Sequence, residues 1–116
     1  MPQYAALIYT RDVDWTQPEY AAENAEYAVF GEQHGAAIRG GAALHPTATA
    51  TTIRVQGARG GEVIASDGPY AETKEALAGF YLLEAADLDA AIKIAADIPG
   101  AWDGAVEVRP VLEFGD

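Results

Sequence analysis

Two charged residues near the carboxyl end of the chain have a spacing that suits ligand binding. Glu107 and Arg109 are two residues apart, and Val106 and Val108 take the alternate positions. Because successive strand residues point to opposite faces, both charges share one face, where they either contact solvent or line a cavity. In a cavity, Arg109 would hold a substrate carboxylate through two hydrogen bonds while Glu107 orients the guanidinium group. The alternative for both is structural ion pairing.

A second group of charged residues surrounds a turn in the middle of the chain. Arg54 stands between apolar neighbours in the same alternating way and is a further candidate ligand contact. Asp67 begins an Asp-Gly-Pro turn, where its carboxylate either bonds its own backbone or acts as a base or ligand anchor at a cavity mouth. Glu72 and Lys74 follow as candidate binding residues, and their alternative is a solvated cluster of paired charges.

The two histidines are candidates for proton transfer, because imidazole titrates near neutral pH without perturbation. His34 falls at the expected end of a helix, so it either stabilises the negative end of the helix dipole or contacts a ligand. His45 precedes a proline in a loop and is either a plain loop residue or a general acid or base. The acidic pairs in the chain lack the further ligands that a metal site needs, so no metal is expected.

These residues must be positioned by strands and helices that alternate along the chain. Apolar patterning and turn residues predict six strands, at Gln3–Thr10, Ala36–Leu44, Thr51–Gln56, Glu62–Ser66, Gly79–Glu84 and Ala105–Val111. A first helix is expected from about Gln17 to His34, with Thr16 as its N-cap in a capping box. A second helix is expected to begin after the N-cap Asp87 and to be ended by Pro99.

Without the inserted hairpin at 51–66, the predicted order is β-α-β-β-α-β, which places both helices on one face of an antiparallel sheet. The strands Gln3–Thr10 and Gly79–Glu84 are apolar on both sides. The other face of the sheet would therefore expose large side chains, each worth about 1.5–3 kcal/mol on burial. A second copy of the chain, packed sheet to sheet about a two-fold axis, is the simplest cover and would enclose a cavity. We therefore expect an α+β homodimer.

Composition excludes several classes of protein. Seven Lys and Arg against 18 Asp and Glu give a net charge of −11, which repels phosphate backbones and anionic lipids, so nucleic acid and membrane partners are not expected. The chain has no cysteine, and its opening lacks a basic, apolar leader pattern, so we expect a cytoplasmic protein. Its 116 residues are of single-domain length, and we expect one domain over 1–116.

Several motifs resemble one known family. They are Gly41-Ala-Ala-Leu-His-Pro46, Thr51-Thr-Ile-Arg54, Asp67-Gly-Pro-Tyr-Ala-Glu-Thr-Lys-Glu75, Gly79-Phe-Tyr81 and Val106-Glu-Val-Arg-Pro110. From about Gly35 to Val111 the chain resembles the DGPF branch of the YCII-related family, with Tyr70 where that branch carries its name-giving phenylalanine. The resemblance implies a ferredoxin-like α+β fold assembled as a dimeric α+β barrel.

The resemblance also implies a pair of acid–base residues. The broader family is associated with a histidine and an aspartate that precedes a proline at the end of the second helix. Asp97, two residues before Pro99, lies near that place. Counting back from Gly35, the histidine of the first helix falls near Asn24, whose amide cannot transfer a proton. The resemblance thus supplies the aspartate of the pair without its histidine.

Three hypotheses for function follow. The first is a cofactor-independent enzyme of small molecules, of isomerase or lyase type, with Asp67, His45 and Asp97 as catalytic candidates. The second is a noncatalytic module that binds or senses a small ligand through Arg54, Arg109, Glu107, Glu72, Lys74 or His34. The third is a structural dimer without a cavity. Fold analogy alone does not choose among them.

Overall fold

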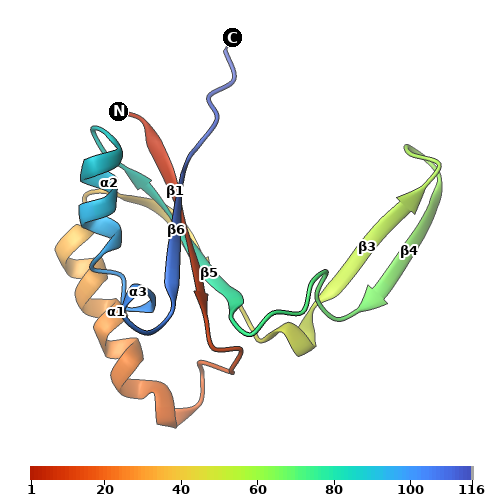
Figure 1. Cartoon of the computed structure of the whole chain (residues 1–116), viewed down its shortest axis with the longest axis horizontal. Coiled ribbons are helices and arrows are strands. Elements are labelled where there is room, and N and C mark those ends of the chain that lie inside the picture. The colour runs from red at the N-terminus through yellow and green to blue at the C-terminus, as the bar shows by residue number, and fades with distance from the viewer. Residues whose placement is uncertain (116) are drawn as a thin grey trace.

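Four strands form the central antiparallel sheet of the computed structural model, which describes residues 1–115. They are β1 (Gln3–Thr10), β2 (Ile38–Ala43), β5 (Ala76–Glu84) and β6 (Ala105–Pro110), in the order β2-β5-β1-β6 (Figure 1). The bounds of β1 are those predicted. β5 begins three residues earlier than predicted, because a bulge lets Ala76 and Leu77 continue the pairing with Thr10 and Tyr9.

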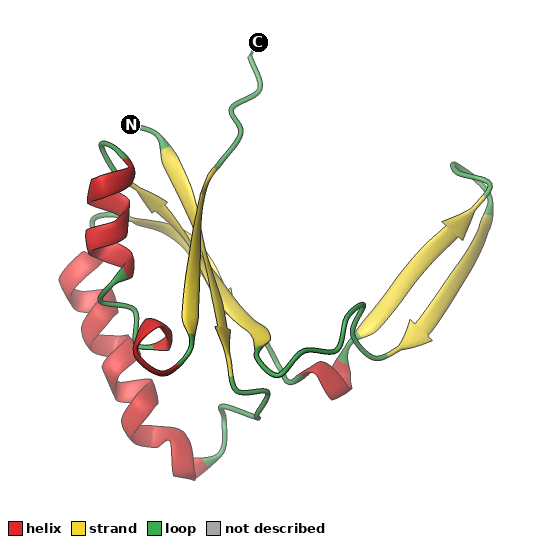
Figure 2. Cartoon of the chain, viewed as in Figure 1, coloured by secondary structure: helices red, strands yellow, loops and turns green. Residues whose placement is uncertain are grey.

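In residues 1–115 the α-helices and the first 3-10 turn pack on one side of this sheet (Figure 2). They are the 3-10 turn η1 (Pro18–Tyr20), α1 (Ala21–His34), α2 (Leu88–Ala95) and α3 (Gly100–Asp103). The predicted first helix thus starts as a 3-10 turn, and the second ends at Ala95, before Pro99. Pro99 instead serves as the N-cap of α3, a helix that the sequence did not predict. In residues 1–115 no helix is both long and apolar enough to cross a bilayer. The α+β class is confirmed.

The predicted capping box at the first helix is wrong. The Thr16 hydroxyl does not cap the helix but donates to the Asp14 carboxylate at 2.6 Å, and the Thr16 N–H donates to the same oxygen at 3.0 Å. The Gln17 side-chain amide donates to the other oxygen at 3.0 Å. The cap of the second helix is as predicted, since the Asp87 carboxylate accepts a 2.8 Å hydrogen bond from the Ala90 N–H.

The core lies between the helices and one face of the sheet. Alternate residues of β1 are buried there, whereas the others are partly exposed on the opposite face. Phe30 from α1, Leu83 from β5 and Ile98 after α2 are the largest fully buried side chains. Burial of each contributes about 1.5–3 kcal/mol to the free energy of unfolding.

No helix in residues 1–115 covers the other face of the sheet. Strand register brings apolar and charged residues together there, because Leu7 lies opposite Phe80 and Glu107, and Ala5 lies opposite Leu82 and Arg109. We call this surface the open face; it comprises Ala5, Leu7, Phe80, Leu82, Glu107 and Arg109. Its apolar centre agrees with the sequence pattern of β1 and β5.

A hairpin projects away from the body of the molecule (Figure 1). It consists of β3 (Thr51–Gln56), with the predicted bounds, and β4 (Glu62–Asp67), which is one residue longer than predicted. In the described chain these strands pair with each other alone, and the 3-10 turn η2 (Thr47–Thr49) precedes them. We call β3 and β4 the arm. The radius of gyration, 16.4 Å, exceeds the roughly 13 Å expected of a compact chain of this length, as a projecting arm requires.

Candidate functional site

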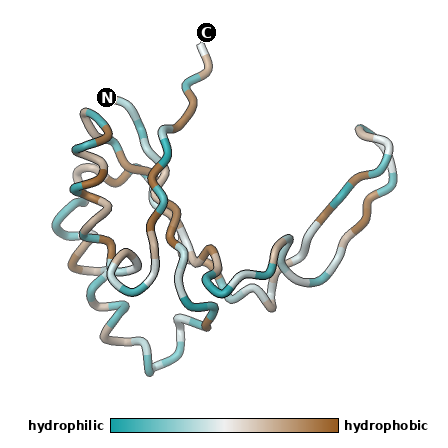
Figure 3. The backbone as a smooth tube through the Cα atoms, viewed as in Figure 1, coloured by the Kyte–Doolittle hydropathy of each residue, from teal (hydrophilic) through white to brown (hydrophobic). Residues whose placement is uncertain are grey.

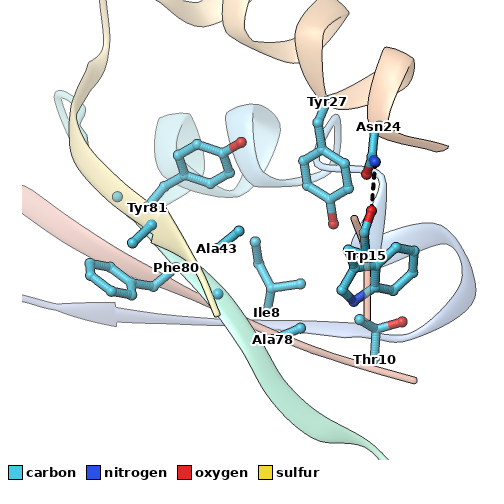
Figure 4. Close-up of a pocket in the computed structure, with 12 residues that line it drawn as sticks. Ile8, Thr10, Trp15, Asn24, Tyr27, Ala43, Ala78, Phe80 and Tyr81 are labelled. Atoms are coloured by element: carbon cyan, nitrogen blue, oxygen red, sulfur yellow. Dashed lines mark hydrogen bonds between the residues drawn. The ribbon is translucent and has the colours of Figure 1, made fainter. Parts of the chain in front are cut away.

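A cavity of about 320 Å³ lies on the helix side of the sheet, between α1 and the edge formed by β2 and β5 (Figure 4). Aromatic and polar side chains from separate elements reach it: Trp15 from the loop before η1, Asn24 and Tyr27 from α1, Thr10 from β1 and Tyr81 from β5. Ile8 and Ala78 supply apolar surface from β1 and β5. The cavity is open to solvent and lies within one chain.

Small residues in the two neighbouring strands leave this space unfilled. Gly41, Ala42 and Ala43 of β2 and Ala78 and Gly79 of β5 line the cavity. A Cβ atom on Gly79 would lie 2.7 Å from the Ala42 carbonyl oxygen, and one on Gly41 would lie 2.5 Å from the Phe80 carbonyl oxygen. Larger residues therefore do not fit at these two positions without moving the strands.

Tyr27 presents an uncharged hydroxyl group to the cavity. Burial raises the pKa of Tyr27 to about 12, and the neighbouring Tyr81 adds to the increase, while the backbone of Gly100 opposes it. Burial also raises the pKa of Tyr81. Both phenols are therefore neutral at any physiological pH and can donate or accept a hydrogen bond.

The loop that carries Trp15 is held by several contacts. The Asn24 side-chain amide donates to the Trp15 carbonyl oxygen at 2.8 Å (Figure 4). The guanidinium carbon of Arg11 lies 5.2 Å from the centre of the Trp15 ring and 5.6 Å from that of Tyr20, in cation–π geometry. Glu23 pairs with Arg11 at 2.7 Å. These contacts hold Trp15 at the cavity wall.

Two of the predicted site residues, His34 and Asp97, contact each other. His34 Nε2 lies 2.8 Å from Asp97 Oδ2, which joins the end of α1 to the segment after α2. Asn24, where the resemblance places the family's histidine, lines the cavity. The His34 ring packs on Phe30 in a tilted arrangement with centroids 5.2 Å apart, and Phe30 packs on Tyr81 in the same way at 4.9 Å. The Phe30 ring thus connects the pair to Tyr81 in the cavity wall.

Glu107 and Arg109 both lie on the open face and are exposed. Their predicted common side is confirmed, because Val106 and Val108 pack against the core on the other side. Neither residue reaches the cavity described above. A role in ligand binding stays a prediction for this pair.

The remaining predicted site residues lie on or near the arm. Arg54 stacks on Tyr70, with its guanidinium carbon 5.1 Å from the ring centre. Asp67 ends β4 opposite Thr51 and is exposed. His45 lies in the exposed loop after β2, and Glu72 and Lys74 lie in the exposed loop before β5. The structure therefore places the three catalytic candidates, Asp67, His45 and Asp97, in separate segments, and none of them lines the cavity.

Comparison with known proteins identifies the chain. The family model of the YCII-related domain matches residues 3–115. The chain belongs to the YCII-related family. An uncharacterized protein from Rhizobium meliloti (strain 1021) is 49% identical over 75 residues, which cover 63% of the YCII-related chain and 58% of that relative. The match therefore spans less than two thirds of the relative's length.

The residues that line the cavity of this YCII-related chain were not predicted as a site. From the sequence alone, tyrosines such as Tyr27 and Tyr81 are expected to be core residues, and nothing in the pattern marks Trp15 or Thr10 as functional. The signal in the sequence is the run of glycine and alanine at 40–43, together with Ala78 and Gly79. Two strands of small residues that pair with each other leave room beside a helix.

Proposed function

We propose that this YCII-related protein binds a small, neutral aromatic molecule in the cavity between α1 and β2. One observation carries the proposal: a preformed cavity of about 320 Å³ combines the Trp15, Tyr27 and Tyr81 rings with a few polar groups. Such a lining is typical of small-molecule sites. The polar groups, on Thr10, Asn24 and the tyrosines, are uncharged, and the net charge of −11 disfavours an anionic ligand.

Tryptophan fluorescence tests this proposal, because the chain has two tryptophans and one of them lines the cavity. The Trp102→Phe variant keeps Trp15 as the reporter. We expect 4-nitrobenzyl alcohol, a neutral aromatic quencher, to quench it saturably, and the anion 4-nitrobenzoate to bind more weakly. In the matched Trp15→Phe variant, exposed Trp102 should show linear, collisional quenching. Linear quenching in both variants, or equal saturation in both, would overturn the proposal.

A second candidate function is cofactor-independent acid–base catalysis, of isomerase or lyase type. The 2.8 Å contact between His34 and Asp97 favours it, because a carboxylate orients an imidazole for proton transfer. His34 does not line the cavity, so simple binding accounts for more of the geometry. His45 and Asp67 stay predicted catalytic residues, outside the cavity.

Proton exchange distinguishes catalysis from binding. A base that removes the proton next to the carbonyl group of an aromatic ketone returns deuterium to that carbon in D₂O. NMR of 4-hydroxyacetophenone in D₂O with the protein measures this exchange. If the pair is catalytic, the wild type accelerates exchange and His34→Gln abolishes the acceleration. A wild type that binds the ketone without accelerating exchange excludes this reaction and leaves the binding function.

The proposal includes a homodimer of the DGPF type, with ferredoxin-like subunits that meet through their open faces as a dimeric α+β barrel. The element order without the arm, β-α-β-β-α-β, and the strand order β2-β5-β1-β6 support it. The charges on the open face also support it, because Glu107 and Arg109 are self-complementary across a two-fold axis. A sheet-to-sheet dimer would bury Leu7, Phe80 and Leu82.

A further inference from the structure

The arm has one apolar face that nothing in residues 1–115 covers. Ile53 pairs with Ala65, and Val55 pairs with Val63, so these four side chains share one face of the hairpin. The exposed fractions of Ile53, Val55 and Val63 are 62%, 47% and 65%. We call the surface that these four side chains form the apolar arm face. Figure 3 shows that both strands of the arm contain hydrophobic stretches. The opposite arm face carries Thr52, Arg54, Gln56, Glu62, Ile64 and Ser66.

A hairpin of this kind needs a partner surface. An isolated pair of strands is marginally stable in water, and strands with exposed apolar residues are prone to associate. Covering each large apolar side chain is favourable, so an uncovered set of three is a strong indication of contact with another molecule.

The position of the arm indicates which molecule that is. The arm projects on the side of the sheet away from the helices (Figure 1), so any molecule that covers the open face lies beside the arm. With standard strand spacing and rise, the four-stranded sheet offers a flat footprint of about 460 Å² and the arm adds about 190 Å². A stable interface buries roughly 800 Å² per partner, so the sheet alone is small for a dimer contact and the arm enlarges it.

We infer that the arm packs its apolar face on a second copy of this chain, the copy that covers the open face. The inference rests on the proposed sheet-to-sheet dimer and adds a second contact to it. A two-fold axis makes this contact reciprocal, so each subunit receives the arm of the other. The self-complementary charges of Glu107 and Arg109 favour a second copy over an unrelated partner as the cover.

Single charge insertions on the two faces of the arm test this inference. Val63→Asp puts a carboxylate on the apolar arm face, and Ser66→Asp puts the same group on the opposite face of the same exposed strand. Sedimentation over a range of concentrations measures the dimer dissociation constant of each variant. We expect Val63→Asp to raise it at least about tenfold, because the charge would be buried without a partner, and Ser66→Asp to change it less than about twofold.

The possible outcomes separate the two proposals. A wild-type dimer whose dissociation constant is unchanged by Val63→Asp overturns the role of the arm and keeps the sheet-to-sheet dimer. A wild-type monomer at high micromolar concentration overturns both. Amide hydrogen exchange covers the case in which Val63→Asp unfolds the hairpin: the amides at 51–67 of the wild type must gain protection as the concentration rises through the dissociation constant. Protection that is independent of concentration overturns the arm contact.

Discussion

Among single residues, Tyr27 is buried in a way that should make the stability of the protein depend on pH. Burial raises its pKa from 10.0 to about 12, so the folded state holds the phenolic proton more tightly than the unfolded state. The resulting stabilisation is complete below pH 10 and is lost as the pH rises from 10 through about 12. We predict that Tyr27→Phe reduces the fall in the free energy of unfolding between pH 10 and 12, measured by urea unfolding at pH 9 to 12.

Tyr20→Phe is the matched control for the Tyr27 prediction, because it removes the same hydroxyl group from a tyrosine that does not line the cavity. Burial also raises the pKa of Tyr81, so some alkaline loss remains in the Tyr27→Phe variant. An alkaline profile that is identical in Tyr27→Phe and wild type would contradict burial as the cause.

Residue patterns predicted some of the candidate site. The alternation of charged and apolar residues was enough to predict that Glu107 and Arg109 share one face, because successive side chains of a strand always point to opposite faces. The contact between His34 and Asp97 was not predicted, because 63 residues separate them and it depends on where two helices end. The cavity was also missed, since an aromatic residue beside empty space has the same local pattern as one in a filled core.

At the scale of elements, Asp14 organises the start of the first helical segment. Hydrogen bonds from Thr16 and Gln17 lower the pKa of Asp14 to about 2. Its contribution to stability is therefore present above pH 4 and is lost as the pH falls toward 2. We predict that Asp14→Asn is less stable than wild type at pH 7 and that the difference disappears near pH 2, as followed by circular dichroism.

A control variant for the Asp14 prediction removes one of the hydrogen-bond donors to the Asp14 carboxylate. Thr16→Val deletes the hydroxyl bond and keeps the backbone N–H bond, so its loss of stability should be smaller than that of Asp14→Asn. A stability difference between Asp14→Asn and wild type that persists unchanged at pH 2 would show that the carboxylate charge is not its source.

The second helix offers a direct test of its cap. Asp87 accepts the Ala90 N–H at 2.8 Å, so Asp87→Ala should lower the free energy of unfolding by about 1 kcal/mol, as loss of an N-cap usually does. Asp89 lies in the first turn of the same helix and provides the comparison. Asp89→Ala should lower the free energy of unfolding, measured by chemical denaturation, clearly less than Asp87→Ala does. Equal decreases in the two variants would show that Asp87 does not stabilise the helix as its N-cap.

The bounds of a strand were predictable where one clear pattern of apolar residues covers it. β1 and β3 have the predicted bounds because continuous or β-branched apolar patterning leaves little choice. The capping box failed because a serine or threonine before a helix looks the same whether its hydroxyl accepts from the helix or donates elsewhere. α3 was missed because four residues after a proline carry no periodic signal.

At the scale of the whole molecule, the open face predicts assembly. Leu82→Asp places a carboxylate at the centre of the proposed dimer contact, and we expect it to shift the protein to monomer in sedimentation. Leu88→Asp makes the same change on the exposed start of α2 and should leave the dimer intact. A Leu82→Asp protein that dimerises as tightly as Leu88→Asp would exclude the open face from the contact.

We propose that the cavity beside α1 holds a small neutral aromatic molecule, and one titration tests this directly. NMR of the ¹⁵N-labelled wild type, titrated with 4-nitrobenzyl alcohol, surveys the backbone amides of the whole chain in one measurement. We predict saturable shifts concentrated at 41–43, at 78–81 and at Trp15, with no shift at the arm or at the open-face residues outside 78–81. Saturable shifts concentrated on the arm or the open face, or no saturable shift, would contradict it.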